Sequence, residues 1–200
     1  MRTLTTFVRR IFKNRFFKNF SARDSGATLA EFAFGLPFLV VILYAIFDFG
    51  GALTLKQKLG ASVYGAARVA AGQSTADLSS SNVAGNGSIA NIRDLVARNL
   101  QGANVNDCGL LGASPTSNTG FTWVFSVNSG CPAPMVLTID RQQVVPVTSG
   151  GTVYNVIYTH IKLDYPFQWR LSQVIQLLVP GGTFPAAATI SVEANMPNLT

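Results

Sequence analysis

The residue types that usually carry enzyme chemistry are scarce in this 200-residue chain. It contains one histidine, His160, and no His-Glu-x-x-His, Gly-x-Ser-x-Gly or phosphate-binding glycine motif. Its acidic residues beyond the N-terminal third are dispersed. We therefore expect no enzyme, no cofactor, no metal site and no small-molecule substrate, and we expect His160 to be a solvated strand residue. A secreted hydrolase is a distant alternative, since catalytic triads assemble in space rather than in sequence.

Two carboxylates border or interrupt a long apolar stretch. The 24 residues from Phe32 to Leu55 contain Asp48 as their only charge, and Glu31 immediately precedes them. A helix of that length rises about 36 Å, enough to cross the ~30 Å hydrocarbon core of a bilayer. The stretch therefore predicts a single transmembrane helix. An ionised carboxylate at membrane depth costs about 2.5 to 3.5 kcal/mol, so Glu31 and Asp48 each need a partner or a watery boundary. Asp48 is most simply explained as a marker of the outer interface.

The charge distribution predicts how this helix is oriented. Residues 1–26 hold seven of the 15 basic side chains against one acidic residue, Asp24, whereas the rest of the chain holds eight of each sign. Positive segments remain in the cytoplasm, so the residues after the span are expected outside. Because the positive charge is confined to this leader, we interpret it as a topology signal and expect no nucleic-acid partner.

The leader itself leaves two alternatives open. Its alternating apolar and basic residues are compatible with an amphipathic helix on an anionic membrane surface, and equally with an unstructured cytoplasmic tail. An ordinary secretory signal explains it less well, because its basic region is long and its apolar region exceeds the usual 7 to 15 residues.

The two cysteines, Cys108 and Cys131, both fall on the expected outer side, where a disulfide can form and persist. Bridging them closes a loop of about two dozen residues, which the chain-entropy relation values at roughly 3 kcal/mol. Two buried free thiols are the alternative. A zinc site is weaker, because two cysteines and the distant His160 fall short of four ligands.

The helical pattern continues beyond the apolar stretch, which predicts one helix from about Leu29 to about Ala71. Pro37 lies inside it and is expected to bend it or to open a few backbone hydrogen bonds.

Small residues recur in the second half of this helix with three residues between them, as in the pairs Ala61 and Gly65, and Ala66 and Ala70. This spacing allows close approach of helix backbones. The approaching helix could belong to another molecule, or the small residues could pack beneath this chain's own globular head, and the sequence favours neither.

The remaining residues predict an α+β head with an antiparallel sheet. A short amphipathic helix is expected over Ile89–Leu100, with Arg93, Asp94 and Arg98 on its polar side. A period of two then predicts strands, and a short helix or interfacial segment is expected over 168–179. The predicted strands cover 121–127, 135–139, 144–147, 153–165 and 189–194. The expected domains are a basic leader (1–26), the transmembrane and continuing helix (27–72) and the exported head (73–200).

The boundary between leader and helix carries a resemblance. Gly26-Ala27-Thr28-Leu29-Ala30-Glu31-Phe32 matches the type IV prepilin processing pattern, in which a basic leader ends in Gly and Glu follows five residues later, before an aromatic residue and an apolar helix. Together with Pro37, Asp48-Phe49-Gly50 and Ala66–Ala71, it resembles the TadE-like family of pseudopilins from Flp/Tad pilus assembly. The resemblance is strongest over Asp24–Gly72 and thin over the head.

The resemblance implies a non-catalytic protein of the bacterial inner membrane whose head lies in the periplasm or at the cell surface. It implies that a prepilin peptidase cuts between Gly26 and Ala27, and that the new amine of Ala27 pairs with Glu31 within or between subunits. The implied partners are this peptidase, other pilin or pseudopilin subunits, the pilus assembly machinery and the lipid bilayer. The alternative is an uncleaved single-pass signal-anchor protein with an exported binding domain.

Overall fold

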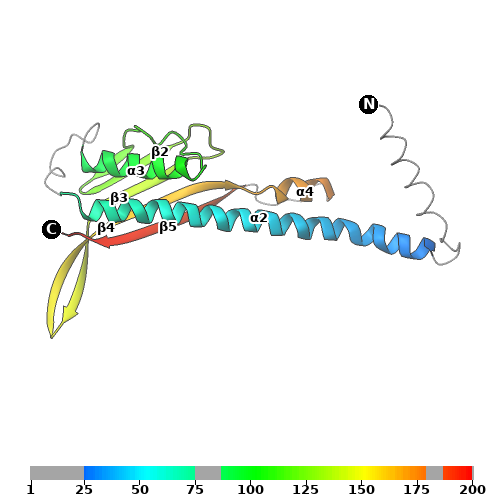
Figure 1. The fold of residues 1–200 in the computed structure, drawn as a ribbon, viewed down its shortest axis with the longest axis horizontal. Coiled ribbons are helices and arrows are strands. Elements are labelled where there is room, and N and C mark those ends of the chain that lie inside the picture. Colours follow the sequence, from blue (N-terminus) through cyan, green and yellow to red (C-terminus); the bar gives the residue numbers. More distant parts are fainter. Residues whose placement is uncertain (1–24, 75–86, 179–186, 200) are drawn as a thin grey trace, which may run out of the picture. The chain divides into compact units, whose positions relative to one another are not determined.

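The computed structural model describes residues 25–74, 87–178 and 187–199. The predicted leader lies outside these residues except for Ser25 and Gly26, and residues 75–86 of the predicted head also lie outside them. The elements, shown in Figure 1, are α2 (Ser25–Ala71), α3 (Ser88–Gly102), β1 (Ser117–Thr119), β2 (Thr122–Val127), β3 (Met135–Ser149), β4 (Thr152–Gln168), α4 (Leu171–Leu178) and β5 (Ala187–Pro197).

Contacts divide the chain into two compact units, Met1–Tyr44 and Ala45–Thr200, and helix α2 contributes to both. The described part of the first unit is helical throughout, and the helix continues through Pro37 without interruption. The end at Ala71 is as predicted, while the start at Ser25 is earlier than Leu29. The segment is long and apolar enough to cross a membrane, as the composition predicted.

The second unit contains a five-stranded antiparallel sheet in the order β1-β2-β3-β4-β5. Each strand pairs with the next along the chain. Short connections join β1 through β4, whereas α4 lies between β4 and β5. The predicted α+β class with an antiparallel sheet is confirmed. β1 lies in a segment that was predicted as a loop, since its three residues are all exposed and lack an apolar pattern.

One face of this sheet forms the core. Cross-strand neighbours place large apolar side chains in two rows, and the second part of α2 and helix α3 contribute buried residues to the same cluster. Because side chains alternate across a strand, the opposite face carries polar residues such as Lys162 and Glu193. The two rows are Trp123, Ile139, Ile161 and Ala194, and Phe125, Leu137, Leu163 and Val192.

The prediction of two separate strands over 135–139 and 144–147 is wrong, because both belong to β3, one strand with a register shift between Asp140 and Gln143. β2 pairs with β3 only as far as Asp140. Beyond that point β3 and β4 continue as a two-stranded hairpin, residues 143–158, which projects from the sheet (Figure 1). Pro146 pairs with Asn155 of β4, and β2 does not reach this part of β3, so Pro146 lies in an edge strand, where proline is tolerated.

The predicted polar side of the short helix also needs correction. Arg93 is buried rather than solvated, although Arg98 is exposed as expected. The Arg93 guanidinium pairs with Asp94, its Nη2 lying 2.7 Å from Oδ1, and donates to the carbonyl oxygen of Ala113. It also lies over the Phe125 ring, 5.9 Å from the centroid. Arg93 therefore fixes the loop after α3 against the sheet, and these contacts compensate for its burial.

Candidate functional site

The predicted processing residues lie in the first two turns of α2. Gly26, Glu31 and Phe32 are exposed, and Ala27 belongs to the same helix. Ala27 and Glu31 are four residues apart, so they lie on the same side of the helix. The structure thus presents the Glu31 carboxylate on an apolar helix that is exposed among the described residues of its own unit, 25–44.

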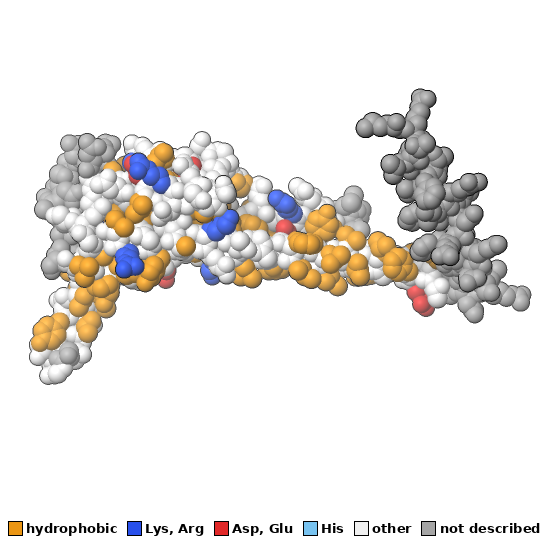
Figure 2. Space-filling view, viewed as in Figure 1, with side chains coloured by type: hydrophobic (Ala, Val, Ile, Leu, Met, Phe, Trp, Pro, Cys, Tyr) orange, Lys and Arg blue, Asp and Glu red, His pale blue; other side chains and the backbone are white. Residues whose placement is uncertain are grey.

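Most of the residues that follow, up to Tyr44, are apolar and exposed. Phe38 is 73% exposed and Leu43 is 46% exposed, although both are the type of side chain that globular proteins bury. Figure 2 shows hydrophobic side chains along this helix. Their exposure is what a lipid-covered helix requires, because hydrocarbon takes the place of a protein core.

Asp48, the other carboxylate of the apolar stretch, is placed differently from Glu31. It is only 7% exposed, and its Oδ2 accepts a hydrogen bond of 2.6 Å from the backbone N–H of Leu171. Leu171 is the first residue of α4, so Asp48 satisfies one of the N–H groups that a helix start leaves without an internal partner. Asp48 therefore joins α2 to the segment after β4, a role that the sequence did not indicate.

Aromatic contacts strengthen the same junction. The Phe49 and Trp169 rings lie 5.1 Å apart between centroids, and Phe167 meets Trp169 edge-on at 5.0 Å. Such tilted pairs are favourable beyond the area they bury. Two neighbouring residues of α2 thus contact the turn between β4 and α4: Asp48 accepts a hydrogen bond from Leu171, and Phe49 packs against Trp169.

The other end of α2 is held by Arg141, which the sequence analysis did not single out. Its side chain is 1% exposed and donates from Nη1 to the Ala70 carbonyl and from Nη2 to the Gln73 carbonyl, at 3.0 Å in the latter case. A cation at the C-terminal end of a helix also compensates for the partial negative charge there. The signal in the sequence was the polar run 140–143, which interrupts the period-two pattern.

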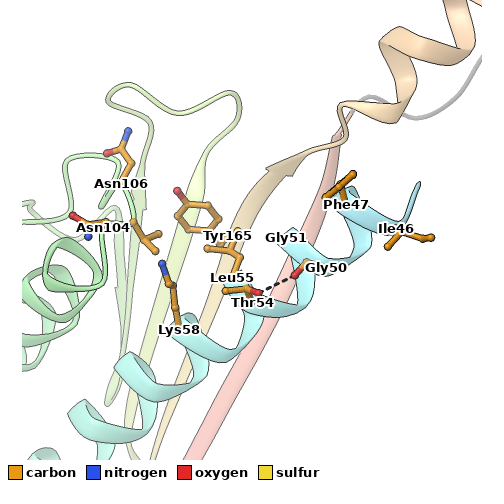
Figure 3. Close-up of a pocket in the computed structure, with 11 residues that line it drawn as sticks. Ile46, Phe47, Gly50, Gly51, Thr54, Leu55, Lys58, Asn104, Asn106 and Tyr165 are labelled. Atoms are coloured by element: carbon orange, nitrogen blue, oxygen red, sulfur yellow. Dashed lines mark hydrogen bonds between the residues drawn. The ribbon is translucent and has the colours of Figure 1, made fainter. Parts of the chain in front are cut away.

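Between these two junctions, α2 borders an open groove with a volume of about 590 Å³ (Figure 3). Lys58 donates from Nζ to the Ala103 carbonyl at 2.8 Å, and Tyr165 lies on the sheet side. Burial, with a smaller effect from Asp107, raises the pKa of Tyr165, so this hydroxyl is neutral at physiological pH. The lining residues are Ile46, Phe47, Gly50, Gly51, Thr54, Leu55, Lys58, Asn104, Val105, Asn106 and Tyr165.

The groove has both polar and apolar side chains in its lining. Its polar groups are neutral amides and hydroxyls plus one lysine. Within residues 25–74, 87–178 and 187–199, no three His, Cys, Asp or Glu side chains come together in a way that could hold a metal ion. His160 lies on the polar face of the sheet, with Nε2 3.5 Å from the Glu193 carboxylate on the neighbouring strand.

Cys108 and Cys131 lie at disulfide distance, with Cα atoms 5.4 Å apart, in agreement with the predicted bond. Backbone and side-chain hydrogen bonds hold the two loops together beside them. The Ser129 N–H donates to the Cys108 carbonyl at 2.8 Å, and Asn106 donates to the Gly130 carbonyl at 2.8 Å. The pair therefore ties the loop after α3 to the turn after β2.

The small residues of α2 pack within the chain. Ala66 and Ala70 belong to the buried core, and Gly65 faces the Asn99 side chain of α3. Ala61 is exposed. Of the two alternatives for this spacing, packing beneath the chain's own head accounts for Ala66 and Ala70.

Comparison with known proteins gives one match. No curated protein and no solved structure matches the chain significantly. The family model described as "TadE-like protein" matches residues 26–68, which begins at the predicted cleavage residue and covers most of α2. The resemblance that Gly26, Glu31, Phe32 and the apolar helix indicated is thereby confirmed as a resemblance to the TadE-like family.

Proposed function

We propose that this protein is a non-catalytic pseudopilin of the Flp/Tad pilus assembly system. It resides in the bacterial inner membrane with the basic leader in the cytoplasm and the head in the periplasm or at the cell surface. The TadE-like match over residues 26–68, the exposed apolar helix and the asymmetric leader charge support this proposal. Under this proposal, the chain takes part in pilus assembly, as the resemblance to the TadE-like family implies.

The observation that carries the proposal is the exposed Glu31 carboxylate on an otherwise apolar helix, five residues after Gly26. A prepilin peptidase cuts after Gly26, removes the positive leader and creates an amine on Ala27. The amine and Glu31 then form a charge pair within one subunit or between neighbours. This pair offsets the cost of carrying an ionised carboxylate at the edge of the hydrocarbon.

Processing is tested by mass spectrometry of the membrane-extracted protein, expressed with and without a prepilin peptidase. The expected result is a new N-terminus at Ala27 that appears only with the peptidase. An intact Met1 terminus under both conditions, or a cut within the second half of α2, contradicts the processing step.

The role of the charge is tested with Glu31→Ala and Glu31→Gln in a strain that assembles pili. Both variants are expected to insert into the membrane and to fail in pilus assembly, because both remove the partner of the Ala27 amine. Glu31→Gln preserves the side-chain size and is the matched control for packing. Normal piliation with either variant contradicts the proposed charge pair.

The head offers a surface for the other proposed partners, the pilin subunits and the assembly machinery. The hairpin over residues 143–158 contains no charged residue and exposes several large apolar side chains. A hairpin that projects from its sheet has marginal stability alone, so contact with another protein would stabilise it. Its exposed apolar residues are Val144, Val145, Val147, Val153, Tyr154 and Ile157.

The groove beside Tyr165 favours a second candidate, an uncleaved signal-anchor protein with an exported binding domain. This candidate requires no peptidase. Co-expression with the peptidase distinguishes the two candidate functions. Only the pseudopilin is expected to lose its leader, and with it the mass of about 26 residues.

A further inference from the structure

The segment from Trp169 to Leu178 has the composition of a membrane-surface helix. Its helical part, α4, has eight residues without a charge, and the exposed Arg170 precedes it. Gln173 and Gln176 are exposed on α4, whereas Val174 and Ile175 are half-buried. The segment thus combines an indole, a cation and an amphipathic helix within ten residues, as interfacial helices do.

Its position along α2 is near the outer end of the predicted span, Phe32 to Leu55. Asp48 accepts the hydrogen bond from the Leu171 N–H, and Phe49 packs against Trp169. Asp48 follows Phe32 by 16 residues, a rise of about 24 Å at 1.5 Å per residue, out of the ~30 Å of the hydrocarbon core. The start of α4 is therefore attached to α2 close to where the predicted span leaves the bilayer.

Apolar side chains are exposed on both elements that meet at this junction. Ile46, Phe47 and Leu53 are exposed on α2 on either side of Asp48 and Phe49. On α4, Val174 and Ile175 are apolar and partly exposed. Since hydrocarbon is the expected cover for the preceding residues of α2, the same lipid leaflet is the occupant that this surface fits.

We propose that residues Trp169 to Leu178 lie in the headgroup region of the leaflet at which α2 leaves the membrane. Trp169 sits at the boundary between hydrocarbon and headgroups, Arg170 meets lipid phosphates, and Val174 and Ile175 enter the upper acyl region. Asp48 is a positioning residue that holds α4 at this depth. The head is then attached to the membrane at two places, through α2 and through α4. This inference requires the membrane span but not pilus assembly or cleavage at Gly26.

Trp169 supplies the test, because the chain has one other tryptophan, Trp123, which is 1% exposed in the core of the head. The full chain is reconstituted in nanodiscs whose lipids carry bromine either close to the headgroup or close to the acyl terminus. Both kinds of brominated lipid are expected to quench the emission of Trp169. The quenching should be at least twofold greater with bromine close to the headgroup than with bromine close to the acyl terminus. The Trp169→Phe variant is the matched control and should lose the lipid-dependent quenching. Unquenched emission in the wild-type protein, or equal quenching in Trp169→Phe, overturns the proposal.

A second measurement examines α4 itself. An environment-sensitive fluorophore is attached at Val174→Cys and, separately, at Gln173→Cys, in the full chain in nanodiscs. The probe at position 174 is expected to show blue-shifted emission and quenching by shallow bromolipids, while the probe at 173 shows at least twofold less of both. Water-like emission at both positions overturns the proposal. Blue-shifted emission at position 174 without quenching by bromolipids also overturns it, because a second protein copy rather than lipid would then cover the segment.

Discussion

The two parts of α2 differ in the pattern of their apolar residues and in what surrounds them. From Thr28 to Tyr44, most of the large apolar side chains of the helix are exposed, whereas from Ala45 to Ala71 one stripe of the helix is buried in the core of the head. In the first part almost every position is apolar, as lipid on all sides requires. In the second part apolar residues recur with helical spacing while Lys56 and Arg68 lie outside the stripe. A single helix therefore passes from one kind of apolar environment to another.

The two carboxylates of α2 follow the same division. Glu31 is exposed on the first part, and Asp48, at the start of the second, is buried and bonded to Leu171. A carboxylate within the head can be compensated by a backbone N–H of the same chain. One on the lipid-facing part needs an amine, another subunit or the aqueous boundary. This difference is why Glu31 carries the proposed assembly role and Asp48 a structural one.

The largest expected effect comes from shortening the same side chain in each part. Leu59 is 0% exposed and Leu43 is 46% exposed. Leu59→Ala is expected to destabilise the head by about 2 to 5 kcal/mol, because it removes buried methyl groups and leaves a cavity. Leu43→Ala is the control and should change head stability by less than about 0.5 kcal/mol. Urea unfolding of the full chain in nanodiscs, followed by Trp123 fluorescence, measures both. Equal effects would contradict the division of α2.

A charge placed on each part of α2 is expected to affect membrane insertion through the first part and not through the second. Phe38 and Tyr64 are both aromatic and exposed. Phe38→Lys is expected to disfavour membrane insertion by about 3 kcal/mol, or roughly a hundredfold in the ratio of inserted to uninserted chains. Tyr64→Lys should leave insertion unchanged, since Tyr64 lies beyond the apolar stretch Phe32 to Leu55 that is expected to cross the bilayer. The inserted fraction in membrane vesicles measures the difference. Loss of insertion with Tyr64→Lys would mean that lipid extends over the second part of α2.

The sequence predicts those features that depend on local pattern. Periodicity was sufficient for the antiparallel sheet and for the end of α2 at Ala71. The exposure of Gly26, Glu31 and Phe32 follows from their position at the start of an apolar helix. The spacing of Gly26 and Glu31 was also enough to indicate the TadE-like resemblance.

Features that depend on distant partners were missed. The partner of Asp48 lies 123 residues away, at the first residue of α4, and no local pattern links the two positions although a short helix was expected over 168–179. The break expected after Ile139 was wrong because the polar run 140–143 is a register shift within one strand. That shift accompanies the burial of Arg141, and tertiary contacts overrode the alternation rule. Arg93 was assigned to solvent because its charge alone does not reveal Asp94 and the Ala113 carbonyl as partners.

The smallest of these effects concerns the end of α2 that Arg141 holds. Arg141→Met keeps much of the buried side-chain volume but removes the donors to the Ala70 and Gln73 carbonyls. The expected loss of stability is about 1 to 3 kcal/mol, because acceptors near the helix end lose their partner while buried. Arg98→Met, on the exposed side of α3, is the control and should have little effect. Urea unfolding measures the stability, and hydrogen exchange in the last turn of α2 should accelerate in Arg141→Met alone. If exchange there is unchanged, packing of Leu59 and its neighbours suffices to hold the second part of α2, and the guanidinium contacts are not needed to end it.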